Sequence, residues 1–267
     1  MDKATIIGLA LGLVAFVGGT IWGAWPNLVT AGWMFDITSL IIVLGGGLGS
    51  AMAAVSMTTF VKGMKAAKVV FRPPTVDPAE GINQIVALAN TARKEGVLAL
   101  EDSAAAMEDE FLKKGIMLIV DGTDPELVKG IMETELAYIE ERHGDIAGVY
   151  DNLAGFFPAW GMIGTLIGLI LMLADLDDMA ALAAGMATAL VTTLYGSVLA
   201  NVWAAPFASK LKQVNKEEML MKTVLIEGML SIQAGENPRI IEEKLKSFLA
   251  PTLRGDVGAP AAGGIVE

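Results

Sequence analysis

The chain has 267 residues, 54% of them hydrophobic, and a mean hydropathy of +0.56, which is too apolar for an ordinary soluble domain and indicates a membrane protein. The absence of cysteine excludes a disulfide framework and thiolate chemistry, and the net charge of −11 argues against nucleic-acid binding. The sequence has one histidine, His143, and no cluster of His, Asp and Glu at ligand spacing, so no metal site is expected.

The first apolar run, residues 5–22, is uncharged and long enough to cross a bilayer. A secretory signal peptide is the alternative, but Asp2 offsets Lys3 in the short region before the run, and a second apolar run follows directly. A retained membrane helix is therefore favoured. Gly8 and Gly12 would let another helix backbone approach it closely.

The second apolar run extends from about Met34 to Phe60, after a turn flanked by Trp22, Trp25 and Trp33. Tryptophans at that position fit an interfacial belt, and simple packing among them is compatible with it. The run contains the glycine-rich segment 45–50. A phosphate-binding loop would precede a helix and usually carry a Lys, so this segment favours close helix packing instead.

The segments outside the apolar runs are charged and helix-prone. Asp77 followed by Pro78 predicts a helix start, and Asn237-Pro238 predicts another. No short alternating apolar runs occur, so no sheet is expected. We predict an all-α membrane protein with four transmembrane helices and a helical cytoplasmic domain. Its segments are 1–60 (membrane helices 1 and 2), 61–150 (cytoplasmic helices), 151–206 (membrane helices 3 and 4), 207–250 (cytoplasmic C-terminal helices) and 251–267 (disordered tail).

The positive residues predict the orientation in the membrane. All 19 Lys and Arg lie at position 3, in 62–142 or in 210–254, and the links 23–33 and 174–179 have none. The positive-inside rule then places both soluble segments and both termini in the cytoplasm.

The hairpin 156–206 contains the candidate chemistry. Neither of its apolar runs has an ionisable residue near its centre, so only hydroxyls and backbone carbonyls can meet a cation there. Pro158 frees a carbonyl one turn earlier and shares a helix face with Thr165, while Thr192 and Thr193 lie on the next helix. The alternative is structural: the threonines bond only to their own helices and the proline only kinks one.

Residues 92–101, Ala-Arg-Lys-Glu-Gly-Val-Leu-Ala-Leu-Glu, resemble the cytoplasmic signature of the flagellar stator subunits MotA, PomA and MotP. The segments 158–168, 189–196 and 204–206 resemble the same family in the same order. The resemblance covers residues 1 to about 250. It implies an ion-conducting subunit, without cofactor, that carries Na⁺ or H⁺ and turns the rotor protein FliG. It also implies a homopentamer around a MotB or PomB partner, which brings the missing membrane aspartate.

The same resemblance implies roles for single residues. Arg93 and Glu101 match the charged pair that engages FliG, although without the family a solvated helix face would be the preferred interpretation. Pro158 and Pro206 match the prolines that couple ion passage to motion. Thr165, Thr192 and Thr193 match the hydroxyls near the ion path, and a threonine at position 165 looks like the sodium-driven type.

Two alternative functions remain. An ExbB- or TolQ-like motor component would have three spanning helices and a different order of soluble segments. A passive membrane scaffold would tolerate replacement of Thr165 or Pro158. An enzyme is not expected, because the sequence has no nucleophile–base pair, metal cluster or phosphate loop.

Overall fold

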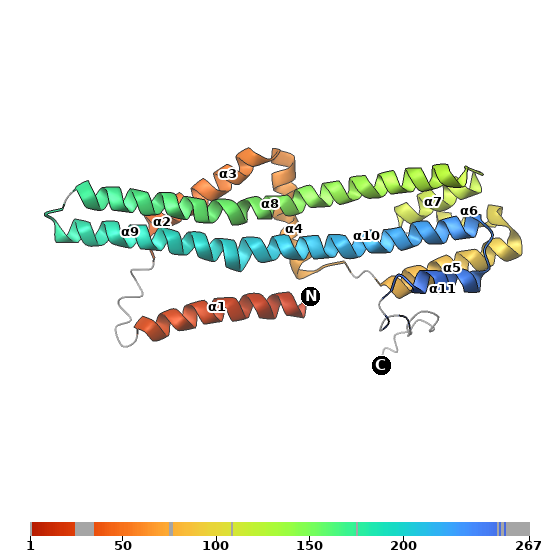
Figure 1. The fold of residues 1–267 in the computed structure, drawn as a ribbon, viewed down its shortest axis with the longest axis horizontal. Coiled ribbons are helices and arrows are strands. Elements are labelled where there is room, and N and C mark those ends of the chain that lie inside the picture. The colour runs from red at the N-terminus through yellow and green to blue at the C-terminus, as the bar shows by residue number, and fades with distance from the viewer. Residues whose placement is uncertain are drawn as a thin grey trace. The chain divides into compact units, whose positions relative to one another are not determined.

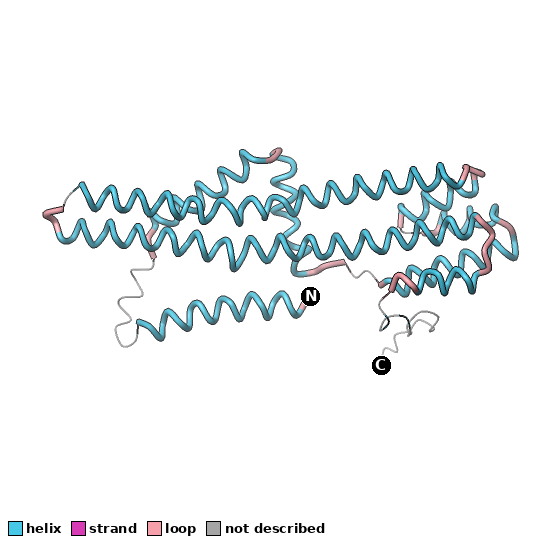
Figure 2. Tube along the Cα trace, in the orientation of Figure 1, coloured by secondary structure: helices cyan, strands magenta, loops and turns pink. Residues whose placement is uncertain are grey.

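The computed structural model describes residues 2–24, 35–74, 77–107, 109–174, 176–249, 251 and 254. Every regular element in these residues is a helix (Figures 1 and 2). Four of the helices are long and apolar enough to cross a membrane. The predicted all-α fold with four long apolar helices is thereby confirmed. Of the expected disordered tail, 251–267, the structure describes only residues 251 and 254, and the turn that holds Trp25 and Trp33 lies outside the described residues.

The chain divides into two compact units. The first comprises residues 1–74 and 142–214, and the second comprises 75–141 and 215–267. The 50-residue helix α8 and the 29-residue helix α10 each contribute residues to both units.

The first unit contains the membrane helices. Its elements are α1 (Lys3–Ala24), α2 (Ile37–Leu40), the π-helix η2 (Ile41–Gly45), α3 (Gly46–Ala54), α4 (Met57–Phe71), the later part of α8 (Pro125–Ala174), α9 (Met179–Val198), the π-helix η4 (Leu199–Ala204) and the first part of α10 (Ala205–Gln233). The second apolar helix was expected to continue to about Phe60, but it ends at Ala54. Val55 and Ser56 are extended, and the Ser56 hydroxyl caps α4 by accepting from the Thr59 N–H at 3.1 Å.

Glycines permit close helix contacts within this unit. A Cβ on Gly46 would lie 2.1 Å from the Trp160 ring, and one on Gly47 would lie 2.5 Å from the Phe157 ring. The glycine-rich segment is thus packed on α8. By contrast, a Cβ on Gly8 would meet nothing within 4 Å, so no neighbour among the described residues packs directly on this glycine.

The second unit is a helical bundle formed by α5 (Pro78–Glu95), the 3₁₀ turn η3 (Val97–Ala99), α6 (Leu100–Ala105), α7 (Glu110–Val120), the start of α8, the end of α10 and α11 (Pro238–Lys246). Its core buries apolar side chains from all of the α-helices, among them Ile82, Leu100, Ile116, Met229 and Ile241. Each such side chain contributes about 1.5–3 kcal/mol relative to an exposed one.

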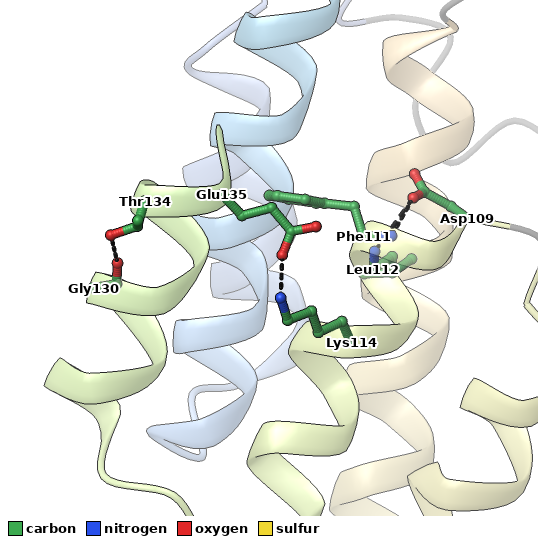
Figure 3. A network of polar contacts seen from close by, with 7 residues as sticks. All are labelled: Asp109, Phe111, Leu112, Lys114, Gly130, Thr134 and Glu135. Atoms are coloured by element: carbon green, nitrogen blue, oxygen red, sulfur yellow. Dashed lines mark hydrogen bonds and ion pairs between the residues drawn. The ribbon is translucent and has the colours of Figure 1, made fainter. Parts of the chain in front are cut away.

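Polar contacts fix the start of α7 and its pairing with α8 (Figure 3). The Asp109 carboxylate caps α7, since it accepts from the Phe111 N–H at 2.8 Å. The Lys114 ammonium, one helical turn along, pairs with the Glu135 carboxylate of α8 at 2.5 Å. Both charged side chains are partly exposed, so this pair contributes to orientation more than to stability.

Candidate ion path

The antiparallel helices α8 and α9 lie side by side and approach closely over their whole apolar length (Figure 1). A Cβ on Gly168 would lie 2.6 Å from the Gly185 carbonyl oxygen, and a Cβ on Gly196 would lie 2.5 Å from the Phe157 carbonyl oxygen. Any larger residue at these glycines would separate the backbones. The small residues of both runs therefore place the polar groups of one helix against the other.

Two of the predicted threonines meet at this contact. The Thr165 hydroxyl of α8 lies 3.0 Å from the Ala189 carbonyl oxygen of α9 and 3.1 Å from the Gly161 carbonyl oxygen of its own helix. It also forms a short hydrogen bond with the Thr193 hydroxyl, in which either oxygen can donate. The Thr193 hydroxyl lies within 3.5 Å of the same two carbonyls.

These four oxygens form a compact group. Thr165 is half-buried and Thr193 is exposed at the surface of the unit. Hydroxyl and carbonyl oxygens of this kind replace the hydration shell of a small cation. The group carries no formal charge, so an ion held here needs a counter-charge from outside the described chain.

Thr192 lies beside this group, and its hydroxyl also contacts the Ala189 carbonyl at 3.1 Å. Its side chain is fully buried and packs on Gly164, where an added Cβ would lie 2.4 Å from its methyl group. Its hydroxyl bonds to the Thr188 carbonyl at 2.8 Å, within α9. The Thr192 hydroxyl therefore bonds within its own helix, whereas Thr165 and Thr193 each bond both within their own helix and across to the other one.

The two prolines stand in different helical contexts. Pro158 lies inside α8 and has no N–H to donate to the Ala154 carbonyl. Pro206 is the second residue of α10, directly after the π-helix η4. A proline removes the hydrogen bond of the preceding turn, and a π-helical turn accommodates that loss by widening the helix.

A cluster of rings connects the neighbourhoods of the two prolines. The Phe157 and Trp203 ring centroids are 5.9 Å apart, and those of Trp203 and Phe207 are 6.1 Å apart. Tyr150 completes the cluster, with its hydroxyl donating to the Gly63 carbonyl at 3.1 Å. The sequence did not predict this cluster. The spacing of aromatic residues along each helix does not show whether the aromatic faces of two helices pack against each other.

A second polar group that the sequence did not predict lies at the start of α2. The Asp36 carboxylate caps α2 through the Ser39 N–H at 2.8 Å, and the fully buried Ser39 hydroxyl contacts the Thr188 carbonyl of α9 at 3.4 Å. The Asp36 N–H donates to the Tyr195 hydroxyl at 3.3 Å. The cap itself was detectable as an Asp directly before an apolar run.

The predicted rotor-binding pair lies in the second unit. Arg93 is exposed at the end of α5, and Glu101 is exposed in the first turn of α6. Between them Gly96 turns the chain with a φ of 90°, and Leu98 is 74% exposed. No ion pair of the described residues involves Arg93 or Glu101, so both charges face outward.

Metal-ligand clusters of three or more His, Cys, Asp or Glu are absent from the part of the chain that the structure describes. Four membrane-crossing helices and the close α8–α9 pair define a multi-pass helical membrane protein.

Comparison with known proteins gives the family. Residues 103–223 match the model of the MotA/TolQ/ExbB proton channel family. Motility protein A of Borreliella burgdorferi is 38% identical over 98% of this chain and 100% of its own, and chemotaxis protein PomA of Vibrio alginolyticus is 38% identical over 93% and 96%. The solved flagellar MotAB stator complex from Bacillus subtilis matches with a TM-score of 0.85 and 31% identity, over 96% of this chain and 100% of that one.

The chain therefore belongs to the MotA/PomA family of flagellar stator subunits, within the MotA/TolQ/ExbB proton channel family. It is a stator subunit of an ion-channel family and not an enzyme. The matches to stator relatives extend over nearly the whole of this chain and nearly the whole of each relative. This favours a stator subunit over an ExbB- or TolQ-like component.

Proposed function

We propose that this chain forms the wall of the ion path in a flagellar stator and couples inward cation flow to torque on the rotor protein FliG. The observation that carries the proposal is the group of oxygens at Thr165 and Thr193, held between two helices that their glycines bring into contact.

The missing charge comes from a partner. The oxygen group is neutral, so a cation passing it requires a carboxylate on another helix. A MotB- or PomB-type subunit with one membrane helix supplies it in this proposal. The similar solved structure from Bacillus subtilis is a MotAB complex, which supports that choice of partner.

The coupling ion in this proposal is Na⁺ rather than H⁺. Hydroxyl and carbonyl oxygens suit a hard cation that exchanges water ligands, whereas a proton relay uses titratable groups. Thr165 and Thr193 offer the first kind of ligand and not the second.

The remaining parts have mechanical roles. Pro158 and Pro206 interrupt the hydrogen-bond ladders of α8 and α10, and they are the positions at which ion passage alters the helices. Arg93 and Glu101 contact FliG through outward-facing charges. Five copies of the chain surround the partner helices in the inner membrane, with both termini in the cytoplasm, as the positive residues indicate.

A complementation assay tests the proposal. A stator-deleted strain should swim when it expresses this chain together with its cognate partner. It should not swim with the chain alone, or when the partner's membrane aspartate is replaced by asparagine, because the ion then has no counter-charge. Swimming that survives the loss of that aspartate would show that the ion path is not shared in this way.

A further inference from the structure

A cavity of about 470 Å³ in the first unit is lined by residues of α1, η4 and α10. One wall carries Gly8 and Gly12 of α1, and the other carries Val202 and Pro206. The ion pair of Asp2 and Lys210 lies at one end of it, with 2.6 Å between the carboxylate and the ammonium. The cavity thus has a mostly apolar interior and a charged end.

Helix geometry explains why this space exists. A Cβ on Gly8 or Gly12 would meet nothing within 4 Å, so neither glycine is filled by a neighbour. Across the gap, the π-helical turn of η4 ends just before Pro206. The α1 wall is therefore open at both glycines, beside Leu9, which packs on the core of this unit.

Basic residues of two helices, α1 and α4, lie next to the charged end, beside the residues that line the cavity. The Asp2 N–H donates to the Phe71 carbonyl at 3.1 Å, which places the end of α4, with Lys68 and Arg72, beside Lys3. Lys3, Lys68 and Arg72 are exposed. Among the described residues no ion pair involves any of these three, so their charge is available to a ligand.

We propose that this cavity binds one anionic phospholipid, with an acyl chain between α1 and α10 and the phosphate against the basic residues Lys3, Lys68 and Arg72. Both walls belong to helices able to cross a membrane, so the cavity is accessible to lipid. The unpaired basic residues favour an anionic headgroup over a zwitterionic one. The proposal rests on the proposed orientation only in assigning the lipid to the cytoplasmic leaflet.

The bound chain also has a mechanical consequence. Pro206 forms part of the cavity wall, and Trp203, three residues earlier, packs against the Phe157 ring beside Pro158. A lipid here fills space next to the element at which the α10 backbone is interrupted. The site is therefore placed to support the coupling prolines without touching the Thr165–Thr193 group.

A membrane helix of a second copy of the chain is the competing occupant, because paired glycines also suit helix packing. A second copy would explain the open glycines. An apolar helix, however, offers no negative charge to the three unpaired basic residues at one end of the cavity. The charge therefore favours the lipid.

The test uses the purified chain with its cognate partner in detergent, titrated with palmitoyl-oleoyl phosphatidylglycerol and followed by native mass spectrometry. Phosphatidylcholine with the same acyl chains tests the headgroup, and glycerol phosphate tests whether the headgroup suffices alone. Gly12→Leu fills the cavity, and Gly19→Leu is its matched control on the same helix, where a Cβ also meets nothing within 4 Å. Arg72→Gln removes a charge at the site, and Lys62→Gln removes one elsewhere on α4.

The proposal expects saturable binding of phosphatidylglycerol, weakened about tenfold by Gly12→Leu and about fivefold by Arg72→Gln, with both control variants unchanged. Equal binding of phosphatidylcholine or of glycerol phosphate would overturn it, as would undiminished binding to Gly12→Leu. Loss of subunits from the assembly in Gly12→Leu, with no lipid bound to the wild type, would assign the cavity to a second copy. The readout is binding to purified protein, so failure here is distinct from failure of the swimming assay.

Discussion

The Phe157 and Trp203 rings lie 5.9 Å apart with their planes inclined by 38°, and each stands close in sequence to one of the two prolines. Phe157 precedes Pro158 directly, and Trp203 precedes Pro206 by three residues. We therefore expect a movement of either interrupted helix segment to be transmitted to the other through the packed rings. In dense packing such rings do not shift independently.

Replacing Trp203 by alanine should break this link. We expect Trp203→Ala to lower the free energy of unfolding by about 3 kcal/mol through lost packing and to reduce motor speed, while Trp203→Phe retains most of both. Thermal unfolding in detergent measures the first effect and tethered-cell rotation the second. Trp22, which is 83% exposed, is the control. An unfolding temperature of Trp203→Ala equal to that of the wild type would rule out a structural role for the cluster.

The contact between α8 and α9 should be sensitive to a single methyl group. A Cβ on Gly196 would lie 2.5 Å from the Phe157 carbonyl oxygen, so Gly196→Ala forces the two backbones apart at a cost of about 1–3 kcal/mol. Gly155→Ala is the matched control, because a Cβ there meets nothing within 4 Å. Unfolding temperatures of the two variants should separate clearly. Equal values would contradict the close approach of the helices.

The helices and the four apolar spans were predictable from the sequence, because a segment that crosses a bilayer must be helical and must consist of about 20 mostly apolar residues. The rotation of each helix about its own axis was not predictable. Thr192 and Thr193 are adjacent in sequence, yet one packs on Gly164 and the other meets Thr165. Which of two neighbours faces the partner helix depends on how closely the backbones approach, and periodicity within one helix does not contain that information.

The break at Ser56 was missed for a similar reason. Hydropathy continues across it, so an apolar pattern extends through a position where the backbone is extended. Serine is a preferred N-cap residue, but hydropathy alone does not mark the helix start that follows Ser56. The two π-helical turns follow from packing and from Pro206, and neither leaves a periodic signal.

Charge reversal at the outward-facing pair tests the rotor contact. Arg93→Glu and Glu101→Lys should each impair swimming while the protein still reaches the membrane, because both side chains are exposed and support no packing. Compensating reversals in FliG should restore swimming. Lys94→Glu changes an exposed charge one residue away and should have a smaller effect. Normal swimming of both reversal variants would remove these residues from the rotor interface.

Because Asp2 pairs with Lys210, we expect the folded protein to lose stability at acid pH. The hydrogen bonds from the Lys210 ammonium and the Thr5 hydroxyl lower the pKa of Asp2 from 3.8 to about 2. A carboxyl group whose pKa is lower in the folded state stabilises the fold at pH values above its unfolded pKa. This stabilisation is lost as the pH falls through the folded pKa.

The gap in unfolding temperature between the wild type and Asp2→Asn should therefore be constant above about pH 5 and narrow as the pH falls toward 2. Asp102→Asn, which changes an exposed carboxylate, serves as the control. A gap that does not change with pH would mean that the pair does not hold α1 in place.

The shared ion path is tested most directly at Thr165, by the speed of single motors in a stator-deleted strain as external sodium is varied at constant pH. The chain with its cognate partner should rotate faster as sodium rises. Thr165→Ser keeps the hydroxyl and should behave like the wild type, whereas Thr165→Ala should need about fivefold to tenfold more sodium for half-maximal speed, since one ligand is lost. Thr20→Ala removes a hydroxyl that bonds only within α1 and should change nothing. Speeds that are independent of sodium, or identical for Thr165→Ala and Thr165→Ser, would contradict an ion path at the Thr165–Thr193 oxygens.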